Sequence, residues 1–177
     1  MTAPHGNLAQ SVHDRLLKLS KARGEDFNFL LVRYALERLL YRLSQSAHEK
    51  DFILKGAMLF TLWSKHAHRA TKDLDLLGSG SPDLERLARV FREICLASVI
   101  NDGLTFDQES VKSRRIKEDA EYEGVRVTLA GKLGSARLAL QVDVGFGDSV
   151  SPPPAIVDFP TYCPSPRPSS KPIVVKP

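Results

Sequence analysis

The first fifty residues carry apolar side chains at helical spacing. Val12, Leu16 and Leu19 share one face of a segment that Gly24 ends, and Asp26 is placed to cap the segment that follows. The second segment repeats apolar residues as a broad stripe: Phe27, Leu30, Leu31, Tyr34, Leu36, Leu39, Leu40 and Leu43. The pattern predicts two amphipathic N-terminal helices that pack on a core.

Three arginines, Arg33, Arg38 and Arg42, lie among the apolar residues of the second predicted helix. They could line a basic groove. They could also extend their aliphatic stems over the core and hold their charges in water, as surface arginines commonly do. We favour the second interpretation.

From residue 52 onward the pattern changes to short apolar runs, several with a period of two. Residues 52–54 and 73–77 predict strands, residues 57–63 predict a helix, and residues 81–83 predict the start of a helix that continues to about residue 98. Further strands are predicted over residues 104–107, 111–117, 123–131 and 137–144. This order predicts an α/β (α+β) domain, with a mixed sheet flanked by helices.

Proline is concentrated at the end of the chain. Nine of the eleven prolines lie from Pro152 to Pro177. Because proline removes a backbone donor and blocks helix formation, we expect this part to be extended or loose. The sequence therefore predicts a core domain over residues 1–150 and a proline-rich tail over residues 151–177.

Composition excludes several classes of protein. The 177 residues are 42% hydrophobic and 26% charged, which is ordinary for a globular chain and excludes full disorder. No apolar run approaches the roughly 20 residues that a membrane span needs, and the N-terminus lacks a signal pattern, so we expect a cytoplasmic protein without a membrane partner. Cys95 and Cys163 form no metal-binding spacing. The net charge of +4 permits a nucleic-acid partner without requiring one.

Acidic residues occupy the polar faces of two predicted strands. Alternate strand residues point to one face, so Asp73 and Asp75 project together, away from Leu74, and Asp143 projects away from Val142. If the two strands are neighbours, three carboxylates converge, and they repel one another unless cations are present. Mg²⁺ accepts carboxylate oxygens and bridges to phosphates, as two-metal nucleotidyl transfer requires. A solvated strand edge is the alternative, because one such aspartate pair is expected by chance.

Gly56 stands between a predicted strand and a predicted helix. A glycine there lets a phosphate approach the backbone, and the free N–H groups of the following helix then face the anion. Thr71 lies two positions before Asp73 and is expected on the same face. Basic residues nearby are candidates for further phosphate contacts: Lys55, Arg69 and Lys72. A simple turn is the alternative for Gly56.

Residues 52–78 (FILKGAMLFTLWSKHAHRATKDLDLLG) resemble the first motif of the AbiEii-type nucleotidyltransferases. These proteins are toxins of type IV toxin–antitoxin systems within the DNA-polymerase-β-like nucleotidyltransferase superfamily. The family pattern is a pair of small residues after a strand, then a helix, then Arg-x-Thr/Ser-x-Asp-x-Asp. The matching residues here are Lys55, Gly56, Arg69, Thr71, Asp73 and Asp75, and Ala57 stands where many relatives have Gly or Ser. Residues 34–46, 122–127 and 140–148 also resemble family segments.

The resemblance implies a Mg²⁺-dependent enzyme that takes NTP as substrate and transfers a nucleotide to a nucleic-acid or protein acceptor. In related toxins the acceptor is the 3′ end of tRNA, and a cognate antitoxin is an implied partner. Asp73, Asp75 and Asp143 would be the catalytic residues and metal ligands, with Asp143 assisting a metal or deprotonating the acceptor hydroxyl. The implied nucleotide-binding residues are Lys55, Gly56, Ala57, Arg69 and Thr71.

The family continues beyond the last residues of this chain, so the resemblance also implies a C-terminal truncation. An inactive remnant that binds nucleotide or RNA without turnover is therefore an alternative function. A plain DNA-binding protein that uses the two N-terminal helices is a third hypothesis, but no helix-turn-helix spacing supports it.

Overall fold

The computed structural model describes residues 5–59, 71–119, 122–147, 153–158, 161 and 172–175. Its helices are α1 (His5–Arg23), α2 (Phe27–Gln45) and α4 (Leu84–Cys95), and two single 3-10 turns are η1 (Glu49–Asp51) and η2 (Ala57–Leu59). Its strands are β1 (Phe52–Lys55), β2 (Asp73–Gly78), β3 (Leu104–Asp119), β4 (Tyr122–Leu133), β5 (Ala136–Gly145), β6 (Ala155–Asp158) and β7 (Pro172–Val175). No described helix is long and apolar enough to cross a membrane.

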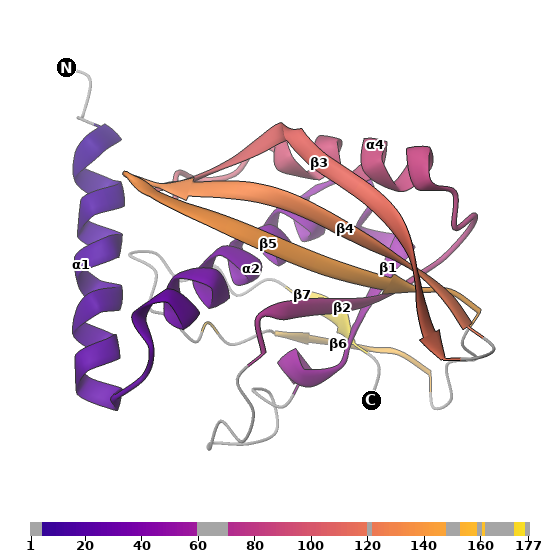
Figure 1. The fold of residues 1–177 in the computed structure, drawn as a ribbon, viewed down its shortest axis with the longest axis horizontal. Coiled ribbons are helices and arrows are strands. Elements are labelled where there is room, and N and C mark those ends of the chain that lie inside the picture. Colours follow the sequence, from indigo (N-terminus) through magenta and orange to yellow (C-terminus); the bar gives the residue numbers. More distant parts are fainter. Residues whose placement is uncertain are drawn as a thin grey trace.

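The strands form one mixed sheet in the order β3-β4-β5-β2-β1-β7-β6 (Figure 1). The pairs β2–β5 and β1–β7 are parallel, and the other neighbouring pairs are antiparallel. The predicted mixed α/β fold with two N-terminal helices is therefore confirmed. The short strands β6 and β7 extend the sheet beyond β1, with Leu54 and Val175 in register. The division into a core domain and a tail stays a prediction.

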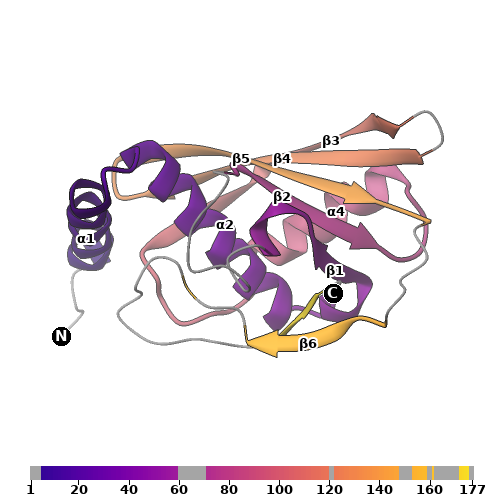
Figure 2. The same ribbon diagram turned by 90° about the horizontal axis from the view of Figure 1, so that it is seen from below.

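Helices α2 and α4 lie on the same side of the sheet, and α1 stands at one end of it (Figures 1 and 2). On the helix side, Leu74 and Leu76 of β2 and Val142 of β5 are almost completely buried. The alternate residues Asp73 and Asp75 are only partly buried. The period-two pattern thus sorts each central strand into an apolar face toward the core and a polar face on the other side.

Helix α2 is buried almost all round, because it packs against α1, α4, β5 and β7. The interpretation of Arg38 and Arg42 as surface arginines is therefore wrong. Both are buried and donate to the carboxylate of Asp102, Arg38 from Nε over 2.9 Å and Arg42 from Nη1 over 2.8 Å. Arg33 is also buried, and its Nε donates to Glu37 over 3.2 Å. Arg38 and Arg42 therefore bind α2 to Asp102, whereas Arg33 forms its ion pair within α2.

Local starts and stops of the helices agree with the sequence in most places. The Asp26 carboxylate accepts a hydrogen bond from the Phe29 N–H over 2.7 Å, which confirms the predicted cap of α2. Helix α4 begins at Leu84, just after the predicted start at residues 81–83, and its N-cap Asp83 accepts from the Arg86 N–H over 2.8 Å. The helix ends at Cys95 rather than near residue 98. Of the helix predicted over residues 57–63, the described part is the turn η2.

The two strands predicted over residues 104–107 and 111–117 are one long strand, β3, interrupted by a bulge. Between Asp107 and Lys112 the register with β4 shifts, so four residues of β3 lie opposite Leu129 alone. The hydroxyl of Ser110 accepts a hydrogen bond from the Ala130 N–H over 2.8 Å. The bulge bends β3 while that hydroxyl replaces the missing backbone acceptor.

Candidate functional site

The structure brings the three predicted carboxylates together on the polar face of the sheet. In the parallel pair β2–β5, Asp75 lies in register with Asp143 and Asp73 with Gln141. Adjacent strands lie about 4.8 Å apart and alternate residues share a face, so Asp73, Asp75 and Asp143 belong to one patch. The expectation that the two strands are neighbours is therefore confirmed. The catalytic roles of these residues stay a prediction.

Basic residues flank the acidic pair at the same level of the sheet. Lys55 of β1 lies in register with Asp75, and Arg126 of β4 lies in register with Asp143. We call Lys55, Asp75, Asp143 and Arg126 the charged row. It runs across four neighbouring strands with two acids at its centre and one base at each end, an order in which neighbouring charges attract at both ends.

Arg126 grips Asp143 with two parallel hydrogen bonds. Its Nε donates to Oδ1 and its Nη2 donates to Oδ2, both over 2.7 Å. The hydrogen-bonded Asp143 carboxylate raises the pKa of Arg126, and the negative charges of Asp73 and Asp75 act in the same direction. Arg126 was not among the residues predicted for the site. The sequence feature that could have indicated Arg126 is its polar position between Val125 and Val127. The alternation of a strand places such a residue on the same face as the carboxylates.

Gly56 is required by the position of Asp75. Its φ is +77°, in the left-handed region that glycine adopts most readily. A Cβ added at Gly56 would lie 2.8 Å from both Cβ and Cγ of Asp75, and it would also collide with Oδ2. Gly56 therefore lets the Asp75 carboxyl lie directly against the end of β1. Its contact with phosphate, and that of Ala57 in the short turn η2, stay predictions.

Thr71 shapes the entry to β2. Its hydroxyl donates to the Asp73 carbonyl over 3.2 Å and accepts from the Asp73 N–H over 3.3 Å. Thr71 was predicted to lie on the same face as the Asp73 carboxylate, and its hydroxyl is hydrogen-bonded to the backbone of Asp73. Lys72 is exposed. The predicted phosphate contact Arg69 lies outside the described residues.

Two of the three carboxylates, those of Asp73 and Asp75, fit a hard divalent cation. Mg²⁺ in proteins is commonly held by one or two carboxylates together with substrate phosphates and waters, and Asp73 and Asp75 supply such oxygens. Within the described ranges, no group of three or more Asp, Glu, His or Cys side chains is arranged to hold a metal ion. Both oxygens of Asp143 already accept hydrogen bonds from Arg126. The residues that fit such an ion are therefore Asp73 and Asp75, with substrate completing its coordination.

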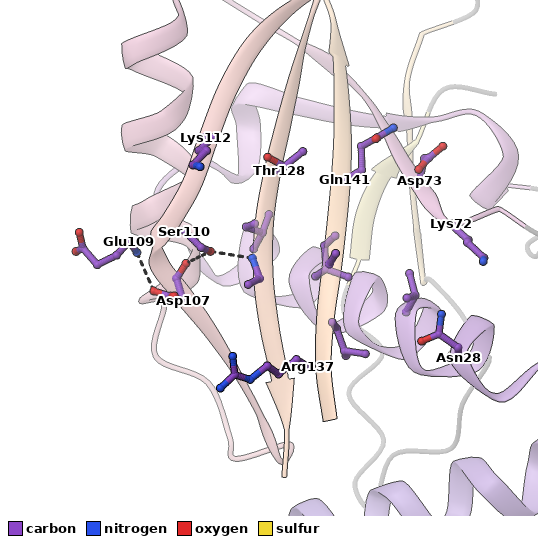
Figure 3. Close-up of a pocket in the computed structure, with 16 residues that line it drawn as sticks. Asn28, Lys72, Asp73, Asp107, Glu109, Ser110, Lys112, Thr128, Arg137 and Gln141 are labelled. Atoms are coloured by element: carbon purple, nitrogen blue, oxygen red, sulfur yellow. Dashed lines mark hydrogen bonds between the residues drawn. The ribbon is translucent and has the colours of Figure 1, made fainter. Parts of the chain in front are cut away.

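A groove of about 920 Å³ begins beside Asp73 and runs over the sheet toward the turn between β4 and β5 (Figure 3). Its floor includes a row of residues in register across four strands: Lys112, Thr128, Gln141 and Asp73. The bulge of β3 forms one wall with Ser110, whose hydroxyl donates to the Asp107 carbonyl over 2.6 Å. Lys72 and Arg137 add positive charge to the lining. Asp107 and Glu109 also line the groove, so it combines basic, acidic and neutral hydrogen-bonding groups beside Asp73.

Comparison with known proteins assigns the chain to the class of nucleotidyl transferases. The family model that matches is described as nucleotidyl transferase AbiEii toxin, type IV toxin–antitoxin system, and it covers residues 38–176. The chain belongs to this AbiEii family. The predicted resemblance is therefore confirmed over most of the sequence.

Among solved structures, the chain is similar to a crystal structure from H. pylori described as that of a candidate nucleotidyltransferase. The two share 14% sequence identity with a TM-score of 0.46. The match covers 83% of this chain and 53% of the other, so the chain spans about half the length of that protein. No protein of curated function matches the chain.

Proposed function

We propose that this protein is a Mg²⁺-dependent nucleotidyltransferase that transfers a nucleotide from NTP to an acceptor hydroxyl. The observation that carries the proposal is the register of β2 with β5, which sets Asp75 beside Asp143 on the open face of the sheet, with Asp73 two residues away. Membership of the AbiEii family supports the same reaction. In the toxin–antitoxin setting of this family, a cognate antitoxin is the expected protein partner.

The reaction balances without a further co-reactant. The acceptor hydroxyl oxygen attacks the α-phosphorus of NTP, the bond from that phosphorus to the bridging oxygen breaks, and pyrophosphate leaves. The hydroxyl proton passes to water. Asp73 and Asp75 would hold Mg²⁺, which would supply positive charge for the phosphates and for the departing pyrophosphate.

The triphosphate is expected at the end of β1, beside the acids. Lys55 lies across from Asp75 and supplies a positive charge at that level of the sheet. The backbone N–H groups of Gly56 and Ala57 are proposed to contact the phosphates. Gly56 has no side chain between the end of β1 and the carboxylate of Asp75. Arg69 is a further proposed phosphate contact. The role that we propose for Thr71 is to fix the direction of Asp73, since its hydroxyl is bonded to the backbone of that residue.

The acceptor is expected in the groove that opens beside Asp73. Lys72, Lys112 and Arg137 provide charges for a phosphate backbone, and Thr128 and Gln141 provide hydrogen-bonding groups between them. Side chains of this kind bind phosphates and the edges of unpaired bases. We therefore favour a nucleic-acid acceptor with a free 3′ end, such as tRNA, over a protein acceptor.

The proposal is tested by incubating the protein with Mg²⁺, each α-labelled NTP in turn, and bulk tRNA. The wild type should attach label to RNA, and Asp75→Asn should reduce incorporation to background because the ion loses a ligand. Asp158→Asn, which removes an exposed carboxylate from β6, is the matched control and should retain activity. Full transfer by Asp75→Asn would refute the assignment. Nucleotide binding without incorporation by the wild type would indicate the binding-only alternative.

A further inference from the structure

The pairing of Arg126 with Asp143 changes how many cations the site can take. The guanidinium uses two of its five N–H donors on Asp143, each over 2.7 Å, in the fork geometry that makes such pairs strong. The Asp143 side chain is only 11% exposed, whereas the Arg126 side chain is 26% exposed. The carboxylate is therefore more enclosed than the arginine, and three of the five N–H donors of the guanidinium are not used on Asp143.

We infer that Arg126 is a built-in cation that takes the place of a second divalent ion in this site. This inference rests on the proposed function, in which Asp73 and Asp75 hold one Mg²⁺. With Arg126 bound, the charge of Asp143 is already balanced and both of its oxygens accept hydrogen bonds from the guanidinium. The site then binds a single divalent ion, and the remaining N–H donors of Arg126 are left for a phosphate of the nucleotide.

The charges on the polar face agree with this assignment. Asp73, Asp75 and Asp143 stand against the two bases Lys55 and Arg126 on the same four strands, and Arg114 adds a third base on β3. A second divalent ion would have to bind beside the positive charge of Arg126. Unlike charges a few ångströms apart attract and like charges repel with similar strength, so the arginine excludes the second ion.

Arg114 provides a matched control. It lies on β3 in register with Arg126, and it is exposed, on the neighbouring edge strand. Replacing either arginine by glutamine removes the same charge from the same level of the sheet. Only the change at Arg126 releases Asp143.

The experiment is a Mn²⁺ titration of the full chain, followed by calorimetry and by the electron paramagnetic resonance signal of free Mn²⁺. The wild type and Arg114→Gln should each bind one ion. Arg126→Gln should bind a second ion or bind the first about tenfold more tightly, because a third carboxylate becomes available. The double variant Arg126→Gln/Asp143→Asn should return to one ion, which shows that the gain depends on Asp143. Circular dichroism melts confirm that each variant is folded.

Equal Mn²⁺ binding by Arg126→Gln and Arg114→Gln would overturn the inference while leaving the proposed metal site intact. Arg126→Lys tests it a second way, because lysine keeps the charge and loses the fork. One ion bound by that variant supports exclusion by charge, and two ions overturn it. Absence of Mn²⁺ binding by every protein would overturn the metal site of the proposed function, and the inference with it.

Discussion

Substitution of Gly56 by alanine adds one methyl group where β1 meets Asp75. The backbone there has φ of +77°, and an L-residue in this region is destabilised by about 1–2 kcal/mol. The new Cβ would also lie 2.8 Å from two carbon atoms of Asp75, a separation that requires a shift of the carboxylate or of β1. Overpacking of this kind typically adds about 1–3 kcal/mol. We expect Gly56→Ala to lose about 2–5 kcal/mol of unfolding free energy.

Gly24 separates the two contributions. It follows α1 with a similar φ of +64°, and a Cβ added there would meet nothing within 4 Å. Gly24→Ala should therefore lose only the backbone part, about 1–2 kcal/mol. The difference between the two variants measures the collision with Asp75. Urea unfolding followed by circular dichroism gives both free energies on the same scale.

The same pair of variants links the glycine to function. Displacement of Asp75 should weaken Mn²⁺ binding and nucleotide transfer in Gly56→Ala, and Gly24→Ala should match the wild type in both assays. The reasoning is refuted if the two variants lose equal stability, or if Gly56→Ala retains full Mn²⁺ binding and transfer. Either result would show that the Asp75 carboxylate does not depend on the absence of a side chain at residue 56.

Three further predictions concern the core and the groove. Asp102→Asn should destabilise the fold by about 3–5 kcal/mol in urea at pH 7, because buried Arg42 loses its anionic partner. Burial would raise the pKa of Asp102, but the hydrogen bonds and charge of Arg42 hold it below its ordinary value. The difference in unfolding free energy between wild type and variant should therefore shrink as the pH falls below about 4. A difference that stays constant with pH would contradict this. Ser110→Ala should cost about 1–3 kcal/mol and speed hydrogen exchange at the Ala130 amide; unchanged exchange would argue against the bulge contact. Burial raises the pKa of Cys95 to about 11, so in a chain with Cys163→Ser alkylation at pH 8 should require unfolding, and rapid labelling of folded protein would disagree.

Local alternation was enough to predict the central strands and their polar faces. In β2, Leu74 and Leu76 alternate with Asp73 and Asp75, and a pattern with period two leaves only one way to bury the leucines. The register of β2 with Asp143 is a different kind of information, because the two strands lie far apart in the chain. The family motif, rather than the alternation, indicated that these strands belong to one site.

The parts that the sequence did not predict depend on distant partners. Arg42 reads as a surface residue within α2, yet its partner Asp102 lies 60 positions away in the loop before β3. Arg126 reads as an ordinary polar position of β4, and its importance appears only when β4 is placed beside Asp143. The polar residues around Ser110 interrupt the alternation of β3, and this interruption suggested two separate strands. No local sequence pattern predicts a bulge in which a side-chain hydroxyl accepts a hydrogen bond from the neighbouring strand.

The one-sided arrangement of the sheet allows chemistry and stability to be separated at this site. Asp75 projects away from the core formed by Leu74 and Leu76, so its removal leaves the packed face of β2 unchanged. The carboxylates of Asp73, Asp75 and Asp143 repel one another, and neutralising one of them relieves that repulsion. Lys55, in register with Asp75, offsets part of that repulsion. A divalent cation that takes Asp75 as a ligand would stabilise its ionised form further. Arg126 already neutralises Asp143 without any bound ligand.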